Sequence, residues 1–285
     1  MSFSVNSRRR RTKVKGKVYI VGAGPGDPKL LTLRALEVIK KADVVLYDRL
    51  VSAEVLQLLP KHARRRCVGK SPNRKRKLQQ SEINDILIGE ARRAQNVLRL
   101  KGGDPFIFSR GGEEAEALKR KGIDFEVVPG ISSAIAAPLY AGIPLTHRDL
   151  SSSVAITTTR EASSKRAPRV KLSEIASNVD TLVILMGAST LGRSCMELIR
   201  GGLSRDTPVA AIQWATTERQ HITLFTLGEA TSDRRSLALK PPCVIVVGRT
   251  AALANSLGWF RKGKVHTCKG FRVTWARGRV EGRKE

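Results

Sequence analysis

Residues 100–114 read LKGGDPFIFSRGGEE. The stretch follows an apolar run at 97–100 and leads into a helical pattern at 113–121, so it is predicted to join a strand to a helix. Its two glycine pairs let the backbone approach a ligand closely, while Asp104 and Arg110 add hydrogen-bond acceptors and donors. In open parallel α/β sheets ligands bind at such loops. The stretch therefore predicts a binding loop in an α/β domain.

Apolar runs of this kind recur along the first half of the chain. The expected strands are 18–21, 44–47, 66–68, 97–100 and 125–128, with helical patterns between them. Strands that alternate with helices indicate a five-stranded parallel sheet with helices on both faces. We expect this N-terminal α/β domain to cover residues 17–146.

The second half has its own pattern of short strands. They are expected at 154–158, 181–185, 209–212, 222–226 and 243–247, with a helix over 191–200. These elements predict a second α/β domain, with a mixed sheet, over residues 147–260. Residues 1–16 are expected to form a flexible basic arm, and residues 261–285 a loosely held basic tail.

Composition excludes several classes of protein. With 285 residues and 41% hydrophobic content, the chain can bury a sizeable core and is not a disordered protein. Its four cysteines and four histidines show no paired spacing, so we expect neither a disulfide framework nor a metal site. No apolar run approaches the roughly 18 residues of a membrane span, and no secretory signal is evident. We therefore expect a cytoplasmic protein without a membrane partner.

The formal net charge of +27 is concentrated in three places. Residues 1–17 contain seven basic residues and no acidic ones, and residues 261–285 contain nine basic and two acidic ones. Both flanks are interpreted as solubilising tails. The eight basic residues in 64–77 follow a strand and could attract an anionic ligand. A nucleic-acid binder is the alternative, but aromatic content is only 5% and no stacking side chains interrupt the basic runs.

The first strand leads into Gly22-Ala23-Gly24-Pro25-Gly26-Asp27, which is similar to a dinucleotide-binding fingerprint. Asp27 stands at the third glycine position, where its carboxylate would repel a pyrophosphate, and Pro25 removes a backbone donor. The pattern therefore disfavours a nicotinamide or flavin cofactor.

The second and third strands end at Asp48 and at Gly69-Lys70. Asp48 could simply cap the next helix, and Lys70 could be one more solvated cation. However, the ends of neighbouring parallel strands lie at the same edge of a sheet. An acid and a lysine placed there can transfer protons if burial shifts their pKa values.

Six motifs in this order resemble the class III, tetrapyrrole-type methyltransferases, which use S-adenosylmethionine. They lie at 21–27, 47–52, 68–70, 102–105, 128–131 and 142–148. The resemblance covers about residues 17–260. It implies two α/β domains with the cofactor in the cleft between them, and a homodimer.

The motifs at 47–52 and 142–148 favour the family members that methylate uroporphyrinogen III twice, via precorrin-1, to precorrin-2 for sirohaem or cobalamin. A later precorrin methyltransferase or diphthine synthase is the alternative.

The resemblance also implies roles for individual residues. Asp48 would accept a proton and Lys70 would donate one, while Arg49 and Arg148 would meet substrate carboxylates. Met186, which alone would be read as core packing, becomes a cofactor contact. The implied cofactor contacts are Pro25, Gly102, Gly103, Asp104, Ile107, Ser132, Ser133, Met186 and Ala215. The sequence departs from the family pattern at Ser109, at Thr159-Arg160 and at Ala215.

Overall fold

The computed structural model describes residues 16–69, 78–159, 170–232, 239–260, 262–268 and 271. The chain divides into two compact units. The N-terminal unit comprises the chain up to Gly24 together with Pro28–Gly130, and the C-terminal unit comprises Pro25–Asp27 and the chain from Ile131. Lys70, Arg160, most of the predicted basic arm and most of the predicted tail lie outside the described residues. None of the helices in the described ranges is long and apolar enough to cross a membrane.

The N-terminal unit is built on a five-stranded sheet in which every neighbouring pair is parallel, in the order β3-β2-β4-β1-β5. This confirms the predicted sheet. The strands are β1 (Lys17–Gly22), β2 (Val44–Tyr47), β3 (Arg64–Cys67), β4 (Asn96–Lys101) and β5 (Phe125–Val128). β3 begins earlier than predicted because its first three residues are arginines, which carry no apolar signal.

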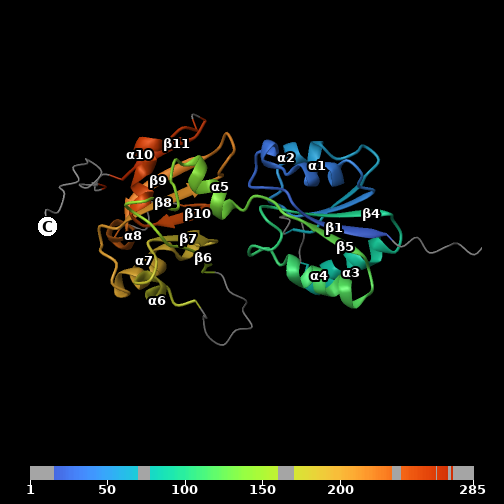
Figure 1. The fold of residues 1–285 in the computed structure, drawn as a ribbon, viewed down its shortest axis with the longest axis horizontal. Coiled ribbons are helices and arrows are strands. Elements are labelled where there is room, and N and C mark those ends of the chain that lie inside the picture. The colour runs from blue at the N-terminus through green and yellow to red at the C-terminus, as the bar shows by residue number, and fades with distance from the viewer. Residues whose placement is uncertain are drawn as a thin grey trace, which may run out of the picture. The chain divides into compact units, whose positions relative to one another are not determined.

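Helices cover both faces of this sheet (Figure 1). One face is covered by α1 (Leu33–Ile39) and α2 (Ala53–Gln57), and the other by α3 (Gln80–Ala91) and α4 (Gly111–Arg120). The short helix η1 (Pro28–Leu30) precedes α1. Because both faces are buried, β1 and β2 contain continuous apolar runs rather than alternating patterns.

The C-terminal unit contains a six-stranded mixed sheet in the order β11-β9-β8-β10-β7-β6. The pairs β6–β7 and β9–β11 are parallel, and the three central pairs are antiparallel. This confirms the predicted mixed sheet. The strands are β6 (Val154–Thr158), β7 (Thr181–Leu185), β8 (Pro208–Gln213), β9 (His221–Thr226), β10 (Cys243–Val247) and β11 (Lys264–Thr267).

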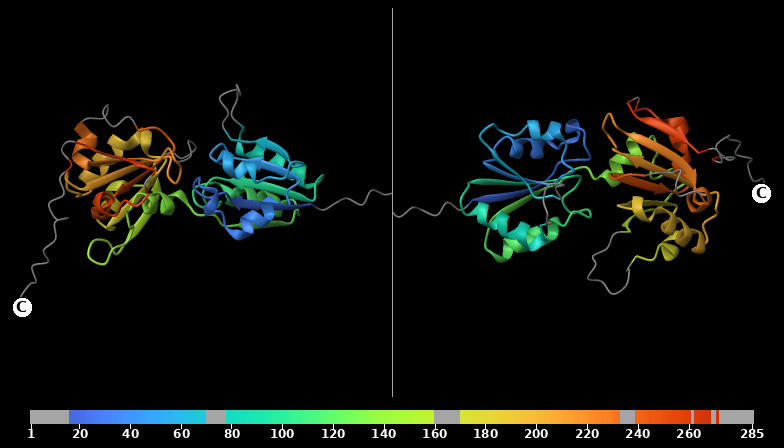
Figure 2. Two further views of the ribbon diagram at one scale, coloured as in Figure 1. Left: turned by 90° about the horizontal axis from the view of Figure 1, so that it is seen from above. Right: turned by 180° about the vertical axis from the view of Figure 1, so that it is seen from behind.

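Helices also cover both faces of the second sheet (Figure 2). One group comprises α5 (Ser133–Tyr140), η3 (Arg249–Leu253) and α10 (Ala254–Leu257), and the other comprises α6 (Leu172–Ala176), η2 (Ala188–Thr190), α7 (Leu191–Arg200) and α8 (Leu227–Ser232). Ala134 and Ala137 of α5 pack in one core cluster with Val183 and Val246. Helix α5 therefore belongs to the C-terminal unit, whereas the sequence-based boundary lies at residue 146. Its small-residue pattern did not reveal which sheet it covers.

Two edge strands carry exposed side chains, most of them polar. In β3, Arg64, Arg65 and Arg66 are exposed, and Arg64 pairs with Glu90 of α3 at 2.8 Å. In β11, which pairs with β9, all four side chains are exposed. The predicted loose tail thus contains a strand. Its sequence gave no sign of one, because an exposed strand needs no apolar periodicity.

Candidate active site

Four glycines bring the end of β1 and the loops after β1, β4 and β5 together, backbone to backbone. Gly103 N donates to Gly24 O at 2.7 Å, and Gly24 N donates to Gly103 O at 3.2 Å. A Cβ on Gly22 would lie 2.6 Å from both Gly103 O and Gly130 Cα. Only glycine permits this approach, and Gly103 itself has a φ of 70°. The glycines form a compact backbone platform at the carboxyl edge of the sheet, and a side chain on Gly22 or Gly130 would push it apart.

Asp104 joins two of these loops. Its Oδ1 accepts a hydrogen bond from Phe106 N at 2.8 Å, and its Oδ2 accepts one from Gly130 N at 3.2 Å. The side chain is half-buried, and a carboxylate has about four acceptor positions, so it retains capacity for a ligand hydroxyl. Two backbone N–H groups therefore fix the Asp104 carboxylate, which can still accept a hydrogen bond from a ligand.

The chain after Asp104 is exposed and strained. Ile107 is 43% exposed, and both Phe108 and Arg110 have left-handed backbones, with φ of 50° and 65°. Ser109, at a position where the resembling family has glycine, donates its hydroxyl to Pro105 O and fastens the turn. Such strain costs about 1–3 kcal/mol per residue and concentrates at functional sites.

The C-terminal unit has strained loops of its own. Met186, directly after β7, has a φ of 58° and is 43% exposed, so the core-packing interpretation of this residue is wrong. Ala215 is buried between Trp214 and Thr216, whose φ angles are 51° and 65°. An exposed thioether and two strained loop residues are consistent with a ligand surface.

Three more of the candidate cofactor contacts lie in the C-terminal unit. Ser132 caps α5 by accepting a hydrogen bond from Ala134 N at 3.2 Å, and Ser133 begins that helix. Pro25 precedes Asp27, whose backbone N donates to Thr216 Oγ1 at 3.2 Å. The structure thus groups the candidates into an N-terminal set and a C-terminal set.

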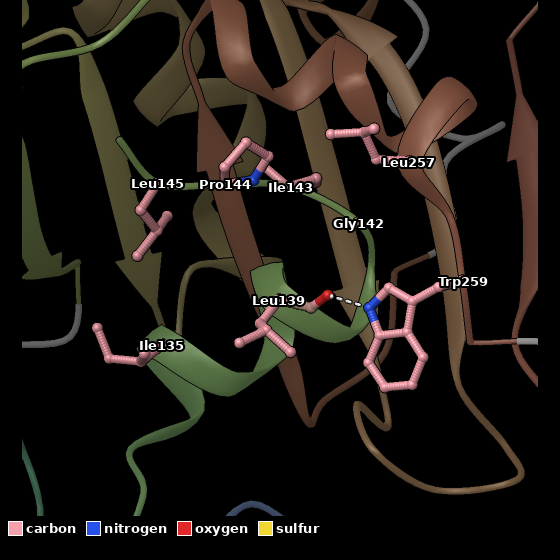
Figure 3. Close-up of a pocket in the computed structure, with 8 residues that line it drawn as sticks. All are labelled: Ile135, Leu139, Gly142, Ile143, Pro144, Leu145, Leu257 and Trp259. Atoms are coloured by element: carbon pink, nitrogen blue, oxygen red, sulfur yellow. Dashed lines mark hydrogen bonds between the residues drawn. The ribbon is translucent and has the colours of Figure 1, made fainter. Parts of the chain in front are cut away.

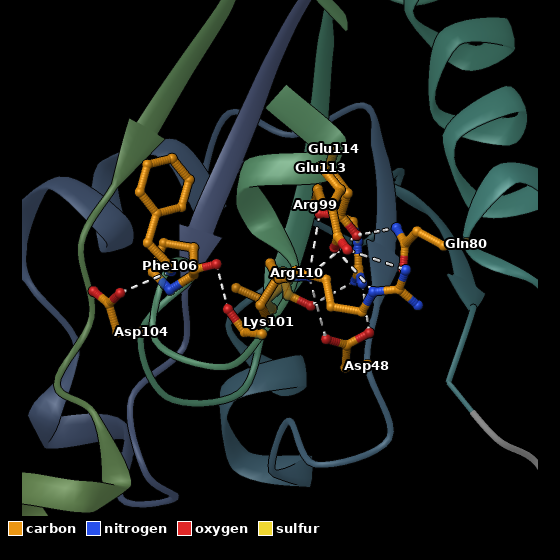
Figure 4. Close-up of polar contacts among 12 residues, drawn as sticks. Asp48, Gln80, Arg99, Lys101, Asp104, Phe106, Arg110, Glu113 and Glu114 are labelled. Carbon is orange, nitrogen blue, oxygen red and sulfur yellow. Dashed lines mark hydrogen bonds and ion pairs between the residues drawn. The ribbon is translucent and has the colours of Figure 1, made fainter. Parts of the chain in front are cut away.

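Asp48, Arg99, Lys101 and Glu114 form an ion network that we call the buried quartet (Figure 4). Arg99 lies at its centre, with Nη2 2.6 Å from Asp48 Oδ1 and Nε 2.9 Å from Glu114 Oε1. Lys101 Nζ lies 3.1 Å from both oxygens of Glu114. Gln80 of α3 donates to Glu114 Oε1 at 3.2 Å. Two cations thus balance two carboxylates.

Burial differs sharply within the quartet. The side chains of Arg99 and Lys101 are 2% exposed and that of Glu114 is 0% exposed, whereas that of Asp48 is 29% exposed. Asp48 is therefore the member that a ligand can reach. It does not cap α2, since Ser52 does so by accepting from Val55 N at 3.3 Å. The capping interpretation is wrong.

The two cations differ in how firmly they hold their protons. Burial opposes the charge of Arg99, but Asp48 and Glu114 outweigh this and raise its pKa. Burial lowers the pKa of Lys101, repulsion from Arg99 adds to the effect, and Glu114 and Asp48 only partly offset it. Arg99 is the permanent cation of the quartet, and Lys101 is the cation that loses its proton more easily.

Sequence reasoning missed Arg99, Lys101 and Glu114. The signal was available in Leu98-Arg99-Leu100-Lys101, where two cations interrupt an otherwise apolar central strand. Charged residues in such a strand are rarely buried unless they are paired. Their partners could not be named, because Glu114 and Asp48 lie on other elements.

Of the remaining candidates, Arg49 and Arg148 are exposed. A Cβ on Gly69 would lie 2.6 Å from Arg49 N, so the end of β3 packs against the loop that carries Asp48. Lys70 itself is outside the described residues, and its pairing with Asp48 stays a prediction.

Residues 17–231 match the family described as Tetrapyrrole (Corrin/Porphyrin) Methylases. The chain belongs to the tetrapyrrole methylases. This confirms the family predicted from the six motifs. The methylase is 47% identical over 242 residues to a uroporphyrinogen-III C-methyltransferase from Methanocaldococcus jannaschii, covering 85% of this chain and 99% of that one.

Two further comparisons extend this result. The methylase is 46% identical to a siroheme synthase from Chromobacterium violaceum. The match covers 87% of this chain but only 52% of the length of that relative. It resembles a solved uroporphyrin-III C-methyl transferase from Thermus thermophilus in complex with S-adenosylhomocysteine. That similarity has a TM-score of 0.72 at 38% identity and covers 84% of this chain and 100% of the other.

Proposed function

We propose that this methylase transfers two methyl groups in succession from S-adenosylmethionine to ring carbons of uroporphyrinogen III, giving precorrin-1 and then precorrin-2. The observation that carries the proposal is its 47% identity to a uroporphyrinogen-III C-methyltransferase over 99% of that relative's length. The product would serve sirohaem or cobalamin synthesis.

The residues present fit an S-adenosylmethionine cofactor. The glycine platform keeps the backbone open beside Asp104, whose carboxylate can accept from ribose hydroxyls. Exposed Met186 offers a soft apolar contact. When bound, the cofactor supplies an electrophilic methyl group. The residues that would hold it are Gly102, Gly103, Asp104 and Ile107 in the N-terminal unit and Pro25, Ser132, Ser133, Met186 and Ala215 in the C-terminal unit.

The chain's own residues position the substrate and move protons. A pyrrole carbon is already electron-rich, so orientation and exclusion of water supply much of the acceleration. The methylated ring must lose a proton, and Asp48 accepts it because its carboxylate is both reachable and hydrogen-bonded to Arg99. The resemblance assigns Lys70 the role of proton donor. Exposed Arg49 and Arg148 attract the carboxylates of the substrate.

An anaerobic incubation with uroporphyrinogen III and labelled S-adenosylmethionine tests the function directly. We expect the mass of the product to show two added methyl groups. Later precorrins and modified elongation factor serve as competing acceptors in parallel reactions. Methylation of either one, with none of uroporphyrinogen III, would assign the chain to another branch of the family.

We also propose a homodimer formed through an apolar groove of the C-terminal unit (Figure 3). The groove has a volume of about 380 Å³. Leu139, Leu257 and Trp259 line it and are 50–53% exposed, and Trp259 Nε1 is fixed by donating to Leu139 O at 2.9 Å. Apolar surfaces of this kind mark interfaces, and the resemblance implies that a second copy is the partner.

Placing a charge in this groove should separate the dimer. We expect Leu139→Asp to sediment as a monomer, because a carboxylate cannot be desolvated in an apolar contact. The matched control is Leu33→Asp, at an 82% exposed leucine of the N-terminal unit, which should leave the sedimentation of the parent unchanged. A dimer that survives Leu139→Asp would exclude this surface.

We propose a cytoplasmic location and no specific nucleic-acid partner. Cys67 and Cys243 are free thiols, and free thiols persist in reducing compartments. Burial raises the pKa of Cys243 to about 12, so this thiol stays protonated and unreactive.

A further inference from the structure

Arg99 contacts the only member of the buried quartet that a substrate can reach. Its guanidinium spans two carboxylates that come from different elements, Asp48 after β2 and Glu114 in α4. A planar fork of donors can hold two such partners at fixed angles, which a lysine ammonium cannot do. The bond to Glu114 prevents the guanidinium from turning away from Asp48.

We propose that Arg99, anchored by Glu114, is a positioning residue that fixes the Asp48 carboxylate and directs one of its oxygens, Oδ2, toward the substrate proton. The catalytic role of Arg99 rests on the proposed function. The effect of Arg99 on the Asp48 carboxylate is present without substrate and can be measured in the free protein.

The two oxygens of Asp48 are not equivalent. Oδ1 receives the 2.6 Å hydrogen bond from Arg99, while Oδ2 lies 3.9 Å from Lys101 Nζ, which is beyond hydrogen-bond distance. Among the described residues, none donates a hydrogen bond to Oδ2. Since 29% of the Asp48 side chain is exposed and Arg99 occupies Oδ1, Oδ2 is the oxygen that can accept a proton.

The charges of the quartet balance across the elements that meet there. Asp48 faces Arg99 and Lys101 of β4, these face Glu114 of α4, and Gln80 of α3 adds a neutral donor. Protonation of Asp48 would leave a net positive charge among side chains that are buried. Neutralising Arg99 should therefore favour protonated Asp48, and neutralising Glu114 should favour its carboxylate.

The test compares Arg99→Met, Arg99→Lys and Glu114→Gln with the parent. The matched control is Arg34→Met, which removes an arginine from an exposed pair with Glu126 of the same unit. Carbon NMR follows the titration of Asp48 without substrate, with the signal assigned by its loss in Asp48→Asn. Methyl transfer is measured across pH, and S-adenosylhomocysteine affinity is measured by calorimetry.

We expect Arg99→Met to move the Asp48 titration, and the acid limb of the pH–rate profile, upward relative to the parent. Glu114→Gln should move both in the opposite direction. The kcat of Arg99→Met should fall about ten- to a hundredfold, with S-adenosylhomocysteine affinity within about twofold of the parent. Arg99→Lys should return the acid limb to its position in the parent but should not restore kcat. Lysine keeps the positive charge but lacks the planar guanidinium that holds two carboxylates. Arg34→Met should match the parent.

Shifts in the same direction for Arg99→Met and Glu114→Gln, or no shift in either, would overturn the inference. So would a loss of S-adenosylhomocysteine affinity that parallels the loss of kcat, since that pattern indicates general damage to the unit. If the opposite shifts appear but the parent does not methylate uroporphyrinogen III, the proposed function fails and the electrostatic role of Arg99 stands.

Discussion

Asp48→Asn should lower kcat for methyl transfer about a hundredfold or more while S-adenosylhomocysteine binding stays within about twofold of the parent. Asparagine has nearly the same shape, and its amide oxygen can still accept the hydrogen bond from Arg99 Nη2 that Asp48 Oδ1 accepts at 2.6 Å. The variant therefore keeps its fold but has no carboxylate to take the ring proton. Turnover and calorimetry measured on the same preparation separate the two effects.

The control for this variant is Asp85→Asn, at an exposed position of α3. It removes the same charge from the same unit at a distance from the quartet and should behave as the parent does. If Asp48→Asn turns over at the parent's rate, proton acceptance must belong to another group and the role assigned to Asp48 is wrong.

Gly22→Ala should lower the thermal unfolding midpoint by several degrees. It should also lower the affinity for S-adenosylhomocysteine by more than tenfold. The new Cβ would lie 2.6 Å from Gly103 O and from Gly130 Cα, so the loops after β4 and β5 must move apart. Overpacking of this kind costs about 1–3 kcal/mol. Gly130 N donates to Asp104 Oδ2, so the displacement also moves the carboxylate proposed to bind the ribose.

Gly89→Ala is the matched control, since a Cβ there meets nothing within 4 Å and the position lies inside α3. Alanine is favoured over glycine in a helix interior by about 0.5–1 kcal/mol, so this variant should melt at or slightly above the parent's temperature. Calorimetry that finds normal ligand affinity in Gly22→Ala would show that the platform does not position the cofactor residues.

Much of the N-terminal fold was predictable because its central strands are buried on both faces. β1 and β2 contain continuous apolar runs bounded by glycine or polar residues. These two strands and β5 were placed within a residue of their observed bounds. β3 and β11 were misplaced or missed because edge strands can be polar. Helix α5 was assigned to the wrong side of the division because an alanine-rich face fits either sheet.

Site residues could be predicted only where a local stretch of sequence identifies them. Asp48 could be proposed because it directly follows an apolar strand, and Asp104 because it lies in the glycine-rich loop after another strand. The ionic partners of Asp48 could not, since Arg99 lies 51 positions away along the chain and is a neighbour only through the pairing of β2 with β4. Long-range pairs of this kind leave no periodic trace in a single sequence.

The three arginines of β3 have a consequence for how the protein behaves in crowded solution. The unpaired backbone groups of an exposed edge strand can form hydrogen bonds with an extended segment of another chain, which is one route to aggregation. Here an approaching chain would have to desolvate Arg64, Arg65 and Arg66, and a second copy would bring three like charges against them. The sheet is thereby protected from growing sideways into a fibre.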